Sequence, residues 1–313
     1  MARKILYPSQ VILEVTTACN LQCKGCAIHG PERCVTRPMG NMKKEVWQKA
    51  ISEIGSWERP VNLTTHGGGE PLLHPALKDI LNIALSFPQI RVGFLTNGML
   101  LDSEWANFIV SKDVDWIAFS VDGVNPKTHA VVRKRSNLSL IENNISRLLS
   151  LREKNGGQNP RVILNMVAYD EVMDQRTAFL ERWLPQVDSV IISHYRNPPS
   201  SKRWSGVTSK RRPCFLLWSQ AVIAWDGRMG LCCEDFDIEI EIGEVETDSI
   251  LESWNGRLIN SIRDAHLKGH VDSLNLCKDC DSWADEIVRE EIHNQKNYKV
   301  LCRASQEEYQ QLR

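Results

Sequence analysis

The sequence predicts an α/β fold, arranged as a partial (β/α)6 barrel of the TIM type with a small C-terminal domain. Short apolar runs alternate with amphipathic segments between residues 11 and 193, and such alternation indicates a parallel sheet. The runs are almost continuously apolar, as expected for strands covered on both faces. An open doubly wound sheet is the alternative architecture. In either arrangement we expect the chemistry at the carboxyl ends of the strands.

Six strands and five helices account for the alternating region. The strands are predicted at 11–15, 61–64, 90–96, 115–121, 161–168 and 188–193. The helices are predicted at 42–55, 75–87, 103–112, 138–153 and 174–184. Apolar residues recur at helical spacing in these segments, which predicts one face that covers the sheet. Gly156 and Gly157 are expected to end the helix at 138–153.

The chain beyond residue 196 breaks this pattern. Residues 197–213 are rich in proline, serine and basic residues, which is typical of a solvated linker; a basic lid over an anionic substrate is the alternative. Asp226-Gly227 between two apolar runs predicts a hairpin, and a helix is predicted over 249–268. The predicted domains are a barrel at 1–196, a linker at 197–213, a thiol-bearing domain at 214–284 and a helical tail at 285–313.

Composition and charge narrow the class of protein. The chain has 313 residues, of which 42% are hydrophobic and 25% charged, with a net charge of −1. These values argue against a disordered chain, a coiled coil or a protein that coats nucleic acid. No apolar stretch is long enough for a membrane span, and no secretory signal is recognisable. We therefore expect a cytoplasmic protein, in which the ten cysteines serve metal binding or catalysis rather than disulfides.

The first group of cysteines directly follows the first predicted strand. Cys19, Cys23 and Cys26 lie within eight residues of each other, so their thiolates can converge on one inorganic centre. Thiolates select zinc or iron–sulfur clusters. A structural zinc site normally takes four protein ligands, which here would require Cys34 or His29. Three cysteines alone leave one metal corner open for a small molecule.

This Cys-x3-Cys-x2-Cys loop resembles the signature of the radical S-adenosylmethionine (SAM) superfamily, over residues 9 to about 196. The resemblance implies a [4Fe-4S] cluster whose open iron binds the amino and carboxylate groups of SAM. It also implies reductive cleavage of SAM to methionine and a 5′-deoxyadenosyl radical, which abstracts a hydrogen atom from the substrate. A reductase such as flavodoxin or ferredoxin is the implied electron donor.

Further residues at strand ends match this family. Gly68-Gly69-Glu70 resembles its GGEP motif, in which the glycines let the backbone approach SAM and the glutamate pairs with the methionine ammonium. Asn97, Ser120 and Asp122 end the next two strands, where the family places polar SAM contacts; turn or capping roles are the alternative for Asn97 and Asp122. Gly25 departs from the family, which often has an aromatic residue there beside adenine.

A second group of cysteines consists of Cys214, Cys232, Cys277 and Cys280. On their chemistry alone, zinc and an iron–sulfur cluster are equally good occupants of such a closed site. Their spacing after a radical SAM barrel resembles the short, twitch form of the SPASM extension, as found in an aminocyclitol dehydrogenase of the superfamily. That resemblance implies an auxiliary [4Fe-4S] cluster, with a role in electron transfer or in structure.

Two further residues are candidates for catalysis. Cys233 adjoins a predicted cluster ligand, and radical SAM epimerases use such a free thiol to return a hydrogen atom; a small buried residue is the alternative. Arg133 follows the fourth strand, from which related barrels direct an arginine towards SAM or the substrate; a solvated charge is the alternative. His194 and Tyr195, at the end of the sixth strand, are expected near the cavity mouth.

The sequence therefore favours a radical SAM oxidoreductase that dehydrogenates a small polar molecule such as a sugar or aminocyclitol. An epimerase that uses a cysteine as hydrogen donor is one alternative, and modification of a ribosomally made peptide is another. A metal-bearing binding protein is the non-enzymatic alternative. We expect no nucleic-acid or membrane partner.

Overall fold

A computed structural model describes residues 7–196, 210–284 and 287–311. These residues form two compact units, each assembled from three separate stretches of the chain. Of the described residues, the first unit comprises 7–18, 35–94 and 210–283, and the second comprises 19–34, 95–196, 284 and 287–311. The units do not follow the domain boundaries drawn from the sequence, which stay a prediction. Most of the predicted linker, 197–209, lies outside the described residues.

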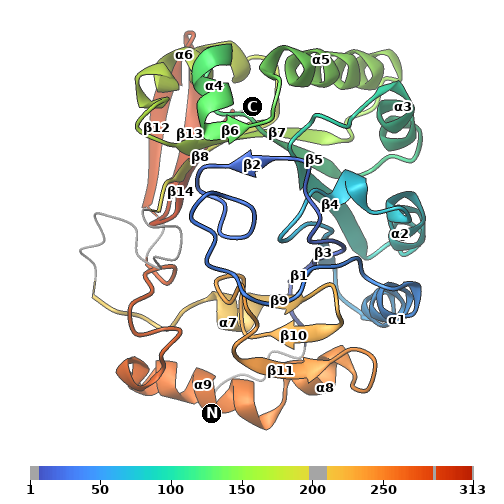
Figure 1. Cartoon of the computed structure of the whole chain (residues 1–313), viewed down its shortest axis with the longest axis vertical. Coiled ribbons are helices and arrows are strands. Elements are labelled where there is room, and N and C mark those ends of the chain that lie inside the picture. Colours follow the sequence, from blue (N-terminus) through green and yellow to red (C-terminus); the bar gives the residue numbers. More distant parts are fainter. Residues whose placement is uncertain (1–6, 197–209, 285–286, 312–313) are drawn as a thin grey trace. The chain divides into compact units, whose positions relative to one another are not determined.

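Parallel strands form the sheet of the first unit. β9 (Gln220–Ile223), β1 (Gln10–Leu13), β3 (Val61–Thr64) and β4 (Ile90–Thr96) lie side by side in that order (Figure 1). β9 comes from the C-terminal half of the chain but runs parallel to β1, so the carboxyl ends of β9, β1 and β3 meet at one edge. β10 (Arg228–Gly230) and β11 (Glu241–Glu244) continue the sheet in antiparallel fashion, and β9 with β10 confirms the predicted hairpin.

The helices of the first unit confirm the predicted pattern, with one correction. α1 (Lys44–Gly55) and α2 (Leu77–Leu85) lie along the outer side of the sheet (Figure 1). The helix predicted over 249–268 is two helices, α8 (Ile250–Trp254) and α9 (Arg257–Lys268). The break falls at Gly256, whose extended backbone caps the second helix. Shorter elements are η1 (Pro71–Leu73), α7 (Leu216–Ser219) and η3 (Val271–Ser273).

The second unit repeats the strand–helix alternation. β5 (Trp116–Ser120), β7 (Arg161–Ala168) and β8 (Ser189–His194) are parallel. Their covering helices are α3 (Ser103–Ser111), α4 (Pro126–Val132), α5 (Leu138–Lys154), η2 (Met173–Gln175) and α6 (Arg176–Trp183). A separate two-stranded ladder joins β2 (Gln22–Cys23) to β6 (Arg133–Lys134). The α/β class and the parallel sheet are thus confirmed.

The C-terminal tail is not the predicted helix. It forms β12 (Ile287–His293), β13 (Lys296–Cys302) and β14 (Gln306–Gln311), an antiparallel meander added to the edge of β8. Tyr298 and Val300 are buried on one face of β13, so apolar residues recur there with the two-residue period of a strand. The many polar residues of the tail obscure this period in the sequence. The hairpin turn at Asn294 and Gln295, both with positive φ, lacks the glycine that usually announces such turns.

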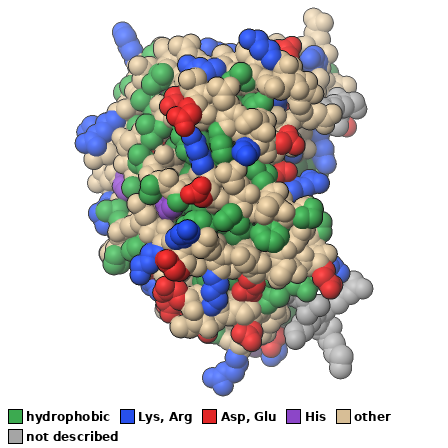
Figure 2. Space-filling view, turned by 90° about the vertical axis from the view of Figure 1, so that its right-hand side faces the viewer, with side chains coloured by type: hydrophobic (Ala, Val, Ile, Leu, Met, Phe, Trp, Pro, Cys, Tyr) green, Lys and Arg blue, Asp and Glu red, His purple; other side chains and the backbone are tan. Residues whose placement is uncertain are grey.

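The surface of the molecule carries both signs of charge. Figure 2 shows lysine and arginine side chains interspersed with aspartate and glutamate over the visible face. In the part of the chain that the structure describes, no helix is long and apolar enough to cross a membrane.

Candidate active site

The three-cysteine loop lies in the second unit, and every one of its thiols accepts a hydrogen bond. The main-chain N–H of Leu21 donates to Cys19 Sγ at 3.5 Å, and that of His29 donates to Cys26 Sγ at 3.3 Å. Arg133 Nη1 approaches Cys23 Sγ at 3.8 Å. Donors aimed at sulfur stabilise the thiolate form, which is the form that ligates metals and clusters. The loop therefore suits three anionic sulfur ligands.

Three thiolates can ligate either a single metal ion or a polynuclear centre. Within the described residues, no three His, Cys, Asp or Glu side chains lie close enough together to hold a single metal ion. A tetrahedral zinc ion would need its sulfur ligands about 2.3 Å from the metal. A four-iron cluster takes each thiolate at a different iron, so it accepts a wider separation.

Asp122 and Arg133, predicted to face SAM or the substrate, bind each other in this structure. Arg133 Nε lies 2.7 Å from Asp122 Oδ2, and the two side chains are 9% and 0% exposed. Asp122 Oδ1 accepts the main-chain N–H of Val167 at 2.7 Å. Burial is the largest single effect and acts to lower the pKa of Arg133, but the Asp122 carboxylate together with Cys23 and Tyr169 raises that pKa above its ordinary value. Burial raises the pKa of Cys23, and Arg133 opposes that rise.

The remaining predicted residues of the second unit lie at strand ends. Asn97 follows β4, is buried, and donates from Nδ2 to Asn20 Oδ1 at 2.7 Å, inside the cysteine loop. Ser120 is buried at the end of β5. His194 Nδ1 lies 2.8 Å from the Ala304 carbonyl oxygen, so its ring is turned towards the C-terminal meander. Asn97 is thus the polar residue of this set in contact with the loop that bears the cysteines.

Tyrosines occupy the space that Gly25 leaves open. A Cβ on Gly25 would lie 2.7 Å from Tyr169 Oη and 2.8 Å from Tyr195 Cε2, so no larger residue fits without displacing them. The Gly25 N–H donates to Tyr169 Oη at 3.2 Å. The two rings lie 4.6 Å apart between centroids. The departure from the family at Gly25 therefore has a structural cause, and Tyr169 is a residue that sequence reasoning missed.

The glycine-rich segment after β3 lies in the first unit and passes tightly over the chain that leads into the cysteine loop. A Cβ on Gly69 would clash with the carbonyl oxygen of Ala18 and would lie 2.7 Å from that of Thr16, which explains the need for glycine. Glu70 is buried; its N–H donates to the Ala18 carbonyl at 2.7 Å, and its side chain caps η1 through the Leu72 N–H. The segment is thereby held in one conformation.

A buried ion pair, which sequence reasoning missed, holds the backbone of the glycine-rich segment after β3. Glu14 and Arg37 form two bonds of 2.6 and 2.7 Å. Glu14 also accepts the N–H of Gly68 at 2.8 Å and of Trp225 at 3.2 Å, while Arg37 donates to the Phe236 carbonyl. The signal was present in the sequence: a single carboxylate in the apolar strand at 11–15 is costly to bury unless it is paired.

The second group of cysteines converges in the first unit. Cys214 interacts electrostatically with Cys277 and Cys280, and Cys232 with Cys277. Burial raises the pKa of Cys214 to about 11 and that of Cys232 well above its ordinary value, because few charges nearby favour a free thiolate. Sites of this kind become anionic when a metal centre supplies the compensating charge. The four thiols, of which Cys277 is buried and the others are partly exposed, therefore fit a metal cluster.

One basic residue supports the backbone of this second thiol site. Arg211 donates to the carbonyl oxygens of Cys280 and Cys277 at 2.7 and 2.9 Å, and its guanidinium lies 4.9 Å from the Trp283 ring centroid. Trp283 Nε1 donates to the Cys280 carbonyl at 2.8 Å. The Cys-x2-Cys turn is thus held by a charged residue that belongs to the end of the predicted linker.

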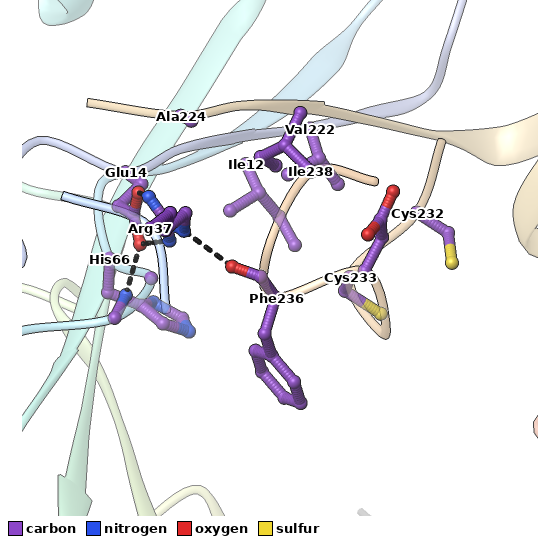
Figure 3. A pocket seen from close by; sticks show the side chains of 13 residues that line it. Ile12, Glu14, Arg37, His66, Val222, Ala224, Cys232, Cys233, Phe236 and Ile238 are labelled. Atoms are coloured by element: carbon purple, nitrogen blue, oxygen red, sulfur yellow. Dashed lines mark hydrogen bonds and ion pairs between the residues drawn. The ribbon is translucent and has the colours of Figure 1, made fainter. Parts of the chain in front are cut away.

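A pocket of about 200 Å³ opens at the edge of the first unit where β1, β3 and β9 end. Its wall joins the glycine-rich segment to the turn that bears Cys232 and Cys233. Figure 3 shows His66 beside the Glu14–Arg37 pair, with Cys232 and Cys233 on the opposite side. Desolvation lowers the pKa of His66 to about 4, so its imidazole is neutral at neutral pH. The lining residues are Ile12, Glu14, Arg37, His66, Gly67, Gly68, Val222, Ala224, Cys232, Cys233, Asp235, Phe236 and Ile238.

Comparison with protein families agrees with both thiol sites. Residues 13–181 match the radical SAM superfamily, and residues 214–281 match the SPASM iron–sulfur cluster-binding domain. The chain belongs to the radical SAM superfamily and is an enzyme of that class with a C-terminal SPASM domain. Its cofactors are SAM, a SAM-binding [4Fe-4S] cluster and an auxiliary [4Fe-4S] cluster.

Two relatives show the range of the class. The chain is 20% identical over 276 residues to the S-adenosyl-L-methionine-dependent 2-deoxy-scyllo-inosamine dehydrogenase of Niallia circulans, covering 88% of this chain and 93% of that one. It is 30% identical over 141 residues to the GTP 3′,8-cyclase of Chlorobaculum tepidum, covering 45% of this chain. The aligned part spans only 41% of the cyclase.

Solved structures share the fold. BtrN in complex with AdoMet and 2-DOIA has a TM-score of 0.62 at 18% identity, covering 88% of this chain and 93% of that one. Streptococcus suis SuiB bound to precursor peptide SuiA has a TM-score of 0.64 at 12% identity, covering 88% of this chain and 71% of that one. At such identities the likeness concerns the fold, while the chemistry must be argued from the residues.

Proposed function

We propose that this enzyme dehydrogenates a small, hydroxyl-bearing molecule of the sugar or aminocyclitol type. The pocket of the first unit carries this proposal, because the glycine-rich segment and the Cys232–Cys233 turn share its wall. Its volume of about 200 Å³ is below the roughly 300–1,000 Å³ of pockets for drug-sized ligands, which favours one ring over a peptide segment. The near full-length similarity to an aminocyclitol dehydrogenase supports the same substrate class.

We assign the cofactors by residue. Cys19, Cys23 and Cys26 would hold the SAM-binding cluster, which a flavodoxin- or ferredoxin-type carrier would reduce. Gly68, Gly69 and Glu70, together with Asn97 and Ser120, would contact SAM. The auxiliary cluster would take Cys214, Cys232, Cys277 and Cys280.

The chain's own residues would bind the substrate and move its proton. When bound, the cofactors supply a carbon radical that removes one hydrogen atom and an acceptor for one electron. The substrate hydroxyl must also lose a proton for its carbon to become a ketone. His66 lines the pocket and is neutral at neutral pH. Its lowered pKa makes it a weak base, so it would accept that proton as the electron leaves and the hydroxyl becomes strongly acidic. The apolar wall of Ile12, Val222 and Ile238 would limit the access of water.

The assay uses 2-deoxy-scyllo-inosamine and related cyclitols as probes, under anaerobic conditions with SAM and a reductant. We expect a ketone product and one 5′-deoxyadenosine for each product molecule. Replacing His66 with glutamine should lower kcat by about 10²–10⁴-fold, whereas His270→Gln, on an exposed residue, should leave kcat unchanged. If no cyclitol or sugar increases 5′-deoxyadenosine formation, the substrate class is wrong; if His66→Gln retains full kcat, the base is wrong.

Epimerisation is a second candidate, because Cys233 lines the same pocket on the side opposite His66 (Figure 3). A thiol there could return a hydrogen atom to the substrate carbon, and the thiyl radical left behind would regain one electron from the auxiliary cluster or the electron carrier and one proton from solvent. In deuterated water, an epimerase would place one deuterium on that carbon, and Cys233→Ala would abolish the label while Cys34→Ala would retain it. A ketone without deuterium in the recovered substrate would exclude epimerisation and support dehydrogenation.

A further inference from the structure

The β2–β6 ladder couples Arg133 directly to the cysteine loop. Cys23 and Arg133 lie opposite each other in this antiparallel pair, and the Lys24 N–H donates to the Val132 carbonyl at 2.8 Å. Residues directly opposite in antiparallel strands have side chains close enough to interact. The backbone therefore sets the arginine beside the second cysteine of the loop.

The side chain of Arg133 is locked into this direction. Asp122 binds Nε at 2.7 Å, and Asp122 is itself held by the Val167 N–H at 2.7 Å. Nη1 is then left to approach Cys23 Sγ at 3.8 Å. Arg133 is 8% exposed and Asp122 is fully buried, so little water screens the guanidinium. Asp122 is paired with Arg133, and the group in contact with Cys23 Sγ is the positively charged guanidinium of Arg133.

We propose that Arg133 is a positioning residue that tunes the SAM-binding cluster, donating a charged hydrogen bond to Cys23 that favours the reduced state. This inference rests on the proposed role of Cys23 as a cluster ligand. A reduced cluster carries one more negative charge, which the guanidinium stabilises, and hydrogen bonds to cluster sulfurs are known determinants of potential. Arg133 would then act through a ligand, and not as a catalytic group on the substrate.

The test is an EPR-monitored redox titration of the complete, anaerobically reconstituted enzyme. The SAM-binding cluster is identified as the signal that changes on addition of SAM. Arg133→Gln should shift the reduction equilibrium of that cluster about tenfold towards the oxidised state, as expected from loss of a charged hydrogen bond; tenfold corresponds to 59 mV for a one-electron couple. Lys134→Gln, the exposed neighbour on β6, is the matched control and should cause no shift.

Arg133→Lys separates charge from folding. Lysine keeps the positive charge without the planar fork, so we expect a potential between those of wild type and Arg133→Gln. If the Arg133→Gln variant does not retain the SAM-binding cluster, the same redox titration of the Arg133→Lys variant tests the proposal. An unchanged potential in whichever variant retains the cluster overturns the proposal. If a Cys23→Ala variant keeps the iron content and the SAM-sensitive signal of the wild type, the assignment of Cys23 as a cluster ligand is wrong instead.

Discussion

Simultaneous replacement of Cys19, Cys23 and Cys26 with alanine is expected to lower the iron content of reconstituted enzyme from about eight to about four atoms per chain. The same variant should form no 5′-deoxyadenosine from SAM. All three sulfurs accept N–H donors in the structure, and alanine removes every ligand of that centre. Iron and sulfide analysis after anaerobic reconstitution measures the first effect, and chromatography of the reaction products measures the second.

The reciprocal variant provides the control for this result. Cys277→Ala/Cys280→Ala should also lose about four irons, but the remaining cluster should keep its SAM-sensitive EPR signal. Cys34→Ala, on an exposed thiol of the same unit as the first loop, should lose none. About four irons in the wild type, none in the triple variant and one zinc per chain in both would contradict the auxiliary cluster and leave a structural zinc site.

Replacing Glu14 with glutamine is expected to destabilise the enzyme by about 3–5 kcal/mol, the range for breaking a buried ion pair by removing one partner. The side chains of Arg37 and Glu14 are 7% and 5% exposed. The substitution leaves the Arg37 guanidinium buried without its counter-charge and weakens the acceptor for the Gly68 and Trp225 amides. Urea unfolding monitored by tryptophan fluorescence measures the change in the free energy of unfolding.

Two comparisons make this prediction specific. Glu14→Gln/Arg37→Met removes both charges, so it should be less destabilised than the sum of its single variants. Arg182→Ala breaks the ion pair with Glu142, in which Arg182 is 42% exposed, and should cost less than about 1 kcal/mol. A loss for Glu14→Gln no larger than that for Arg182→Ala would show that the buried pair does not hold the glycine-rich segment.

Local pattern was sufficient for the elements that repeat a strict period. The strands at 61–64, 90–96 and 161–168 have the predicted bounds, since their apolar runs are bounded by turn residues. The helix at 138–153 begins as predicted at Leu138 and ends one residue later, at Lys154. The strands of the C-terminal tail could not be predicted from local pattern. They are stabilised because β14 pairs with β8, which is distant in the chain, and no local sequence feature indicates such a partner.

The sequence by itself determined the class of this enzyme, because the cysteine spacings and the glycine-rich motif are local and chemically specific. It also determined the α/β alternation, which follows from the periodicity of apolar residues. Only the tertiary structure decided that Arg133 pairs with Asp122 and contacts Cys23. It also decided that His66 lines the same pocket as Cys233, and that Arg37 neutralises Glu14. Each of these depends on side chains that are distant in sequence meeting in space, where burial makes an unpaired charge too costly to remain.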